Sequence, residues 1–127
     1  MNQQALSSLI WSVADLLRGD FRQSEYGRVI LPFTVLRRLD GVLAPTKEAA
    51  LKEYAAKRAA DVAFEPFVKR KTGLDFYNVS SLDMAKLMGD QDNIRANLDS
   101  YIQGFSPDVR SIFEHFEFAG TIERLHK

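Results

Sequence analysis

Residues 24–43 read SEYGRVILPFTVLRRLDGVL, and nearly every turn of this stretch is apolar. At about 100° per residue its apolar side chains point in nearly every direction and leave no clean polar face. A helix of this kind has to be covered on several sides, so we place it at the centre of an all-α fold. Ser24 is expected to cap the helix through its hydroxyl. Pro32 removes one amide in the second turn and is expected to kink the helix there.

The length and composition fit one globular domain over residues 1–127. Of these residues 46% are hydrophobic and 27% are charged, which is enough to bury a core. Seventeen basic and seventeen acidic residues cancel, so any contact with nucleic acid has to come from a local patch. There is no cysteine, and hence no disulfide or thiolate chemistry. Neither a secretory signal nor a membrane span is visible, so we expect a cytoplasmic protein with no membrane partner.

Helical patterns lie on both sides of the central stretch. A first helix is expected over residues 4–18, with one narrow apolar stripe and Gly19 as its stop. Trp11, the only Trp of the chain, lies on the far side of that stripe. Either a later segment covers it, or it contacts another domain or subunit, where Trp is enriched as an anchor. Residues 47–64 are rich in Ala, Lys and Glu, and predict a peripheral helix with a thin apolar side that includes Val62.

The second half of the chain predicts shorter elements. Residues 75–79 are expected to be extended and to pack two aromatic side chains on the bundle. A last helical pattern starts at residue 117 and is unfinished at Lys127, as expected for a piece of a longer protein. In total we expect an irregular bundle of six or seven helices around the kinked helix 24–43. The expected shorter helices are 82–88, capped by Ser80 or Ser81, 93–103, capped by Asp92, and one beginning at Pro107, capped by Ser106.

Residues suited to catalysis are scarce in this chain. His115 and His126 have no second ligand four residues away, so no metal site is expected. Residues 90–93 resemble half of a calcium loop but lack its Gly and its distal Glu, and we interpret them as helix capping. No Gly-rich phosphate-binding loop is present. From the residues alone, the chain is a helical binding or assembly module.

A series of short motifs runs along the chain. They are IW at 10–11, ADLLRG at 14–19, YGxVILP at 26–32, LRRLD at 36–40, FYNxS at 76–80, DNI at 92–94, LxxYI at 98–102, FS at 105–106 and IF at 112–113, where x is any residue. In order and spacing they resemble the N-terminal helical domain of the modification (M) subunit of type I restriction–modification systems. The resemblance covers essentially the whole chain.

The resemblance implies a larger protein in which this domain precedes a methyltransferase domain. That domain transfers a methyl group from S-adenosylmethionine to adenine N6 in DNA. The present chain has neither the Asn/Asp-Pro-Pro-Phe/Tyr motif nor the Gly-rich loop of such a domain. The resemblance therefore assigns no catalytic and no cofactor-binding residue here, and S-adenosylmethionine is implied for the parent protein alone.

The resemblance further implies a role in assembling the complex and closing it around DNA. The implied partners are a specificity subunit, a second M subunit, double-stranded DNA and, indirectly, the restriction subunit. Such a role requires an apolar docking face and phosphate-contacting cations. The candidates are Trp11 and Ala14 for docking, Arg37 and Arg38 on the central helix for phosphate, and Lys69, Arg70 and Lys71, in the loop after the peripheral helix, also for phosphate.

Two simpler interpretations fit the same residues. Arg37 has an equal claim to an internal ion pair with Asp15 or Asp40, and three adjacent cations are most often only a solvated surface. The competing function is a stand-alone helical adaptor that binds protein and has no role on DNA. The two functions differ in whether DNA affinity exists and falls with salt.

Overall fold

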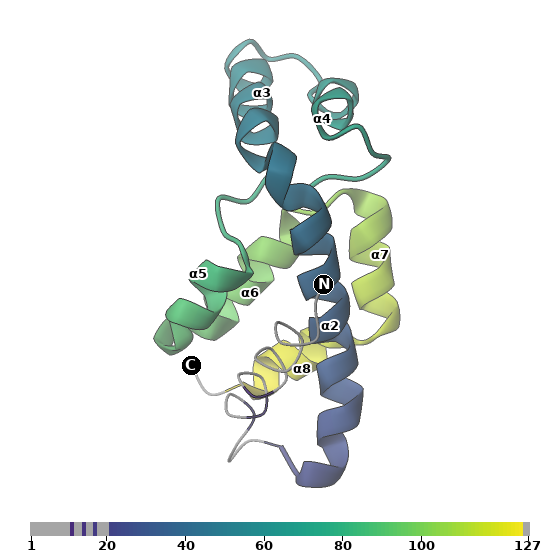
Figure 1. Ribbon diagram of the computed structural model, residues 1–127, viewed down its shortest axis with the longest axis vertical. Coiled ribbons are helices and arrows are strands. Elements are labelled where there is room, and N and C mark those ends of the chain that lie inside the picture. The colour runs from purple at the N-terminus through teal and green to yellow at the C-terminus, as the bar shows by residue number, and fades with distance from the viewer. Residues whose placement is uncertain (1–10, 12–13, 15–16, 18–20, 126–127) are drawn as a thin grey trace.

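The computed structural model describes residues 11, 14, 17 and 21–125. The fold is all-α, as predicted, with no β-strand in these residues. Figure 1 shows an elongated molecule in which α2 (Tyr26–Leu43) runs along the long axis. The other α-helices between residues 21 and 125 are α3 (Lys47–Ala59), α4 (Glu65–Thr72), α5 (Met84–Gly89), α6 (Ile94–Gln103), α7 (Pro107–His115) and α8 (Phe118–Arg124).

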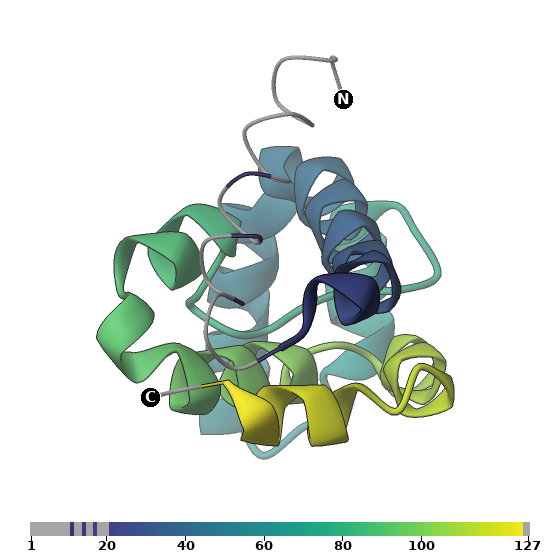
Figure 2. The same ribbon diagram turned by 90° about the horizontal axis from the view of Figure 1, so that it is seen from below.

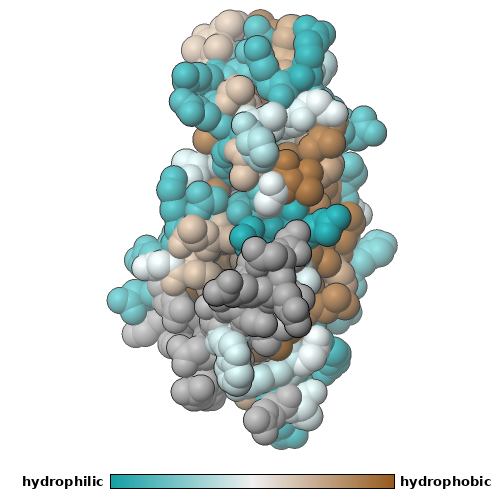
Figure 3. Space-filling model, in the orientation of Figure 1, coloured by the Kyte–Doolittle hydropathy of each residue, from teal (hydrophilic) through white to brown (hydrophobic). Residues whose placement is uncertain are grey.

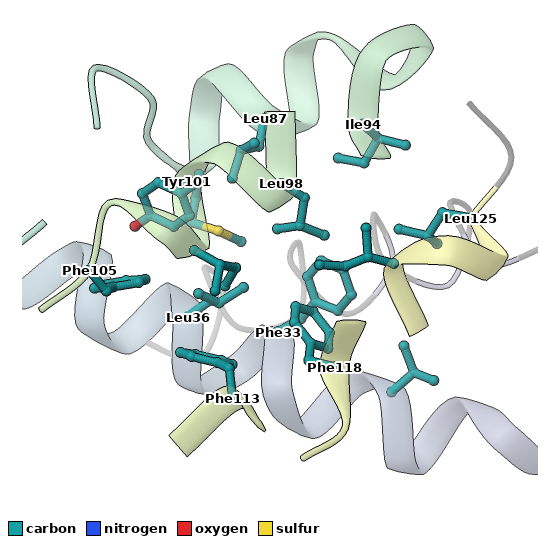
Figure 4. Packing of buried hydrophobic residues seen from close by; sticks show 14 of the residues in the cluster. Phe33, Leu36, Leu87, Ile94, Leu98, Tyr101, Phe105, Phe113, Phe118 and Leu125 are labelled. Atoms are coloured by element: carbon teal, nitrogen blue, oxygen red, sulfur yellow. The ribbon is translucent and has the colours of Figure 1, made fainter. Parts of the chain in front are cut away.

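Helix α2 lies at the centre of the core, as the sequence predicts. Phe33 and Leu36 are completely buried. Figure 4 shows them facing Leu98 and Tyr101 of α6 and Phe118 of α8. The rings of Phe33 and Phe118 meet edge to face with their centroids 5.3 Å apart. The view from below in Figure 2 shows the later helices gathered around α2.

Helix α2 is covered on several sides, as expected, but one side of it stays exposed. Leu31 and Val42 remain 54% and 43% exposed. The helix is continuous through Pro32, and the Thr34 hydroxyl donates a hydrogen bond to the Ile30 carbonyl at 3.0 Å. The kink at Pro32 stays a prediction. One side of the central helix therefore reaches the surface of this domain.

The start of α2 differs from the expected Ser24 cap. A 3-10 turn, Gln23–Glu25, leads into the helix, and no side chain caps it. Instead Glu25 Oε1 accepts a hydrogen bond from the Arg22 amide at 2.8 Å, and Glu25 Oε2 lies 2.8 Å from Arg124 Nη1 of α8. The hydrogen bond from Arg124, followed by that from the Arg22 amide, lowers the pKa of Glu25 to about 2. Arg124 thus ties α8 to the beginning of the central helix.

Helices α3 and α4 form a hairpin at one end of the molecule (Figure 1). Helix α3 ends at Ala59, earlier than the predicted residue 64. Asp61 takes a left-handed conformation with φ 55°, and the Val62 amide donates to the Lys57 carbonyl at 2.9 Å. This hydrogen bond and the left-handed residue before it are those of a Schellman motif, with Asp in the position that Gly usually holds. Val62, expected on the apolar side, is 44% exposed. The hairpin packs on a small core of its own formed by Ala50, Val68 and Tyr77.

The segment between α4 and α5 is extended near Asn78, as predicted, and this residue anchors it. Asn78 forms an isolated antiparallel bridge with Phe105. Its side-chain nitrogen donates to the Tyr101 carbonyl at 2.9 Å, and its side-chain oxygen accepts from the Ser80 amide at 2.7 Å. Asn78 is almost completely buried, so these bonds satisfy a side chain that would otherwise be costly to bury.

Lys47 and Tyr101 extend this polar link toward α2. Lys47 Nζ donates to the Leu82 carbonyl at 2.9 Å and lies 5.4 Å from the centroid of the Tyr101 ring. The Tyr101 hydroxyl donates to Asp40 Oδ1 at 3.0 Å. Burial lowers the pKa of Lys47 and raises the pKa of Tyr101. Because these shifted groups have partners inside the fold, we interpret them as structural and not catalytic.

The capping residues of the later helices differ from the predicted ones. Asp83, and neither of the preceding serines, caps α5 by accepting from the Lys86 amide at 2.8 Å. A 3-10 turn leads into α6, which no side chain caps, so the predicted Asp92 cap is wrong. Helix α7 begins at Pro107 as predicted, but the Ser106 hydroxyl accepts from the Tyr77 amide at 3.4 Å instead of capping it.

The expected first helix falls mostly outside the described residues, whereas the last helical pattern lies inside them up to Leu125. Within residues 4–18, Trp11, Ala14 and Leu17 are described and helical, and Leu17 is completely buried. The predicted stop at Gly19 and the residues 126–127 lie outside the described part. Helix α8 covers seven residues of the last pattern.

Candidate docking and DNA-contacting surfaces

Trp11 is the most exposed large apolar side chain that the structure describes. It is 75% exposed, whereas Leu17 of the same helical segment is buried and Ala14 is half-buried. The alternative that a later segment covers Trp11 is therefore wrong. An exposed indole retains a large apolar surface whose burial on a partner is favourable. Trp11 is thus placed as a docking residue would be.

A second apolar surface lies on α2. Leu31, Val35 and Val42 share one face of the helix, since they are spaced by four and seven residues. Arg38, an exposed candidate for phosphate, occupies the same face between Val35 and Val42. Figure 3 shows apolar surface in the middle of the molecule, below the mostly hydrophilic end that α3 and α4 form. Arg among apolar side chains is typical of protein interfaces, so this setting fits docking better than phosphate contact.

Arg37 does not form the internal ion pair with Asp40 that the sequence left open. No salt bridge of Arg37 occurs among the described residues, and Asp40 accepts the Tyr101 hydroxyl instead. Asp15, the other suggested partner, lies outside the described residues. Arg37 borders a shallow cavity of about 390 Å³, lined by Arg37, Arg38, Gly41 and Val42.

The basic run lies in a helix and not in the predicted loop. Lys69, Arg70 and Lys71 form the last turn of α4, where the helix dipole favours positive charge. Arg70 and Lys71 are exposed, and Lys69 is half-buried. Lys69 contributes to lowering the pKa of Asp108 at the start of α7, an effect dominated by the hydrogen bond from the Ser106 hydroxyl.

Sequence reasoning missed two cations on α3 that lie against aromatic rings. Lys57 Nζ is 4.3 Å from the centroid of the Phe67 ring, and the Arg58 guanidinium carbon is 5.7 Å from that of Tyr54. Arg70 approaches the same Phe67 ring at 5.5 Å. The Ala-rich pattern of α3 predicts a helix but does not indicate which side chain of α4 Lys57 meets. The four-residue spacing of Tyr54 and Arg58 within α3 was a signal for their contact.

Two larger cavities lie around α8. One, of about 570 Å³, lies between the start of α2 and α8, and the other, of about 450 Å³, lies between α6, α7 and α8. Among the residues described, no cluster of three or more His, Cys, Asp or Glu side chains is arranged to hold a metal ion. His115 is exposed at the end of α7, and His126 lies outside the described residues. The surfaces above are therefore the stronger candidates for function.

Comparison with protein-family models decides what kind of domain these helices form. The model of the HsdM N-terminal domain matches residues 6–127. The chain belongs to this family. HsdM is the M subunit of type I restriction–modification systems, so the resemblance drawn from the motifs is confirmed and the HsdM N-terminal domain is a component of that enzyme complex. No curated protein and no solved structure matches the chain. No helix in its described part is long and apolar enough to cross a membrane.

Proposed function

We propose that this HsdM N-terminal domain docks the M subunit onto its neighbours and contacts DNA without making or breaking bonds. The neighbours are the specificity subunit and a second M subunit, with the restriction subunit reached indirectly. The parent protein would transfer a methyl group from S-adenosylmethionine to adenine N6 in DNA. We assign neither the cofactor nor the transfer to any residue of this domain. The family match over residues 6–127 supports the proposal.

The exposure of Trp11 is the observation that carries the docking role. Truncating an interface Trp that is buried in a complex commonly costs ~2 kcal/mol or more of binding free energy. Trp11→Ala is therefore expected to weaken binding of this chain to the partner subunits by about 30-fold or more. Affinity is measured by sedimentation or surface plasmon resonance. Trp11 is the only Trp of this chain, so once the emission of the partner subunits is subtracted, the remaining emission should shift to shorter wavelength when the wild-type chain docks.

Val62→Ala is the matched control for this substitution. Val62 is another exposed apolar residue, at 44%, but it lies beyond the end of α3. Its truncation is expected to leave affinity within about twofold, as for an interface-neutral side chain. If Trp11→Ala and Val62→Ala change affinity equally little, Trp11 is no anchor and the docking role proposed for it is wrong.

The competing function is an adaptor that binds only protein. Exposed cations favour the DNA role, because each Lys or Arg that neutralises a phosphate releases a condensed counterion. Arg70 and Lys71 are exposed, and neither forms a salt bridge within the described residues. DNA affinity that falls steeply with salt is the property that an adaptor lacks.

A further inference from the structure

Charge is distributed unevenly over a chain that is neutral as a whole. Residues 47–72, which form α3, α4 and their connection, carry an excess of three positive charges, so the rest of the chain carries an equal negative excess. This hairpin lies at one end of the molecule (Figure 1), where Figure 3 shows a mostly hydrophilic surface. A basic element at the end of a molecule is suited to contact with a polyanion. The cations are Lys47, Lys52, Lys57, Arg58, Lys69, Arg70 and Lys71, and the anions are Glu48, Glu53, Asp61 and Glu65.

One aromatic ring brings together cations from both helices. Lys57 Nζ of α3 lies 4.3 Å from the centroid of the Phe67 ring, and the guanidinium carbon of Arg70 of α4 lies 5.5 Å from it. The separation of the two cations is therefore at most the sum of these distances. Lys57 also pairs with Glu53 at 3.2 Å, whereas Arg70 has no carboxylate partner among the described residues. A cation–π contact at an exposed site contributes only ~0.5–1 kcal/mol.

Arg58 also lies against an aromatic ring, that of Tyr54 one turn earlier on α3. Its guanidinium carbon is 5.7 Å from the Tyr54 centroid, and Nη1 donates to the Tyr54 hydroxyl at 3.4 Å. Most of the five N–H groups of the guanidinium remain available to an anion. A side chain held against a ring loses less rotamer entropy when it binds, which lowers the cost of association.

The helix dipole alone does not explain this arrangement. It favours cations in the last turns of α3 and α4, and so accounts for the presence of Lys57, Arg58 and the basic run. It does not require a cation from each helix to meet on the Phe67 ring. The convergence is a property of the hairpin as a unit.

We infer that the α3–α4 hairpin contacts the phosphate backbone of double-stranded DNA, with Lys57, Arg58 and Arg70 as the contacting cations. Phe67 positions two of the three. The inference rests on the DNA role proposed above and names the element that performs it. Phosphate contacts carry no sequence information, so the hairpin binds DNA of any sequence equally. Arg38, which lies among apolar side chains on α2, is excluded from this set.

The test is duplex DNA binding by the chain assembled with its partner subunits, measured by fluorescence anisotropy over a range of KCl concentrations. In the Lys57→Gln/Arg70→Gln variant the slope of log affinity against log salt should fall in magnitude by about 2, because each phosphate contact contributes ~0.9. Affinity at moderate salt should fall about tenfold or more. The matched control is Lys86→Gln/Arg95→Gln, which removes the same charge from exposed positions outside the hairpin. Its slope should change by less than ~0.5.

Substitutions of Phe67 separate positioning from charge. Phe67→Leu keeps every cation but removes the ring, and is expected to weaken DNA binding about threefold or more. Phe67→Tyr keeps a ring in place and should restore wild-type affinity. Circular dichroism and thermal melting check that each variant is folded. Equal affinities for the Leu and Tyr variants would contradict the positioning role of Phe67.

The outcomes separate this inference from the function on which it rests. If the wild-type assembly does not bind DNA, both the DNA role and the hairpin assignment are wrong. If the wild type binds with a steep salt dependence and the hairpin variant behaves like its matched control, only the hairpin assignment is wrong. A loss confined to the hairpin variants supports the inference.

Discussion

Phe33→Ala is expected to destabilise the domain by ~3–5 kcal/mol, the cost of truncating a buried Phe that leaves a cavity. Phe33 is completely buried on α2, and its ring meets Phe118 of α8 edge to face. Domains of this size are stable by only ~5–15 kcal/mol, so this variant would be close to unfolding at room temperature. The measurement is urea denaturation followed by circular dichroism at 222 nm. The wild type and the variant are analysed with the same slope of unfolding free energy against urea concentration.

Leu31→Ala is the matched control for Phe33→Ala on the same helix. Leu31 lies two residues earlier and is 54% exposed, so its truncation should change stability by no more than ~0.5–1 kcal/mol. If both substitutions cost the same, α2 is not packed as described and the central position of Phe33 is wrong.

Gly104→Ala is expected to cost ~2–3 kcal/mol, because a methyl group at this position has no room. A Cβ on Gly104 would lie 2.8 Å from Asn78 Oδ1, Ser80 Cβ and the Ser80 backbone nitrogen. One of these is backbone, and Asn78 is held by bonds to Tyr101 and Ser80, so none of the three yields easily. The φ of Gly104 is −75°, which any residue adopts, so the glycine is required by close approach and not by conformation.

Gly120→Ala tests the same change without the collision. Gly120 lies inside α8, and an added Cβ would have no neighbour within 4 Å. Ala in a helix interior is more favourable than Gly by ~0.5–1 kcal/mol, so this variant should melt at a higher temperature than wild type. A Gly104→Ala variant that melts at or above the wild-type temperature would show that the extended segment at Asn78 does not pack against the end of α6.

The all-α fold and its centre could be predicted because burial depends on a simple pattern. A stretch as apolar as residues 24–43 has few alternatives to a covered helix. The exposure of Leu31 and Val42 could not be predicted, since composition does not distinguish burial within a domain from burial against another subunit. The exposed side of α2 is therefore the side on which a partner could pack.

Caps and helix ends were predicted poorly for a local reason. Ser, Asp and Asn side chains have several backbone amides within reach, and small differences in geometry decide among them. Asp83 rather than Ser80 caps α5, and Asp61 ends α3 in a conformation usually left to Gly. The Phe67 cluster is harder still, because it joins residues of two helices whose packing is not encoded in either pattern alone.

The salt dependence of DNA affinity shows whether this domain both docks and contacts DNA. Partner subunits are titrated with duplex DNA in the presence and absence of this chain, at KCl concentrations from low to moderate. We predict higher affinity with the chain present, and a log–log slope steeper by ~0.9 for each phosphate that its cations neutralise. Identical affinities and slopes with and without the docked chain would contradict the account and favour a protein-only adaptor.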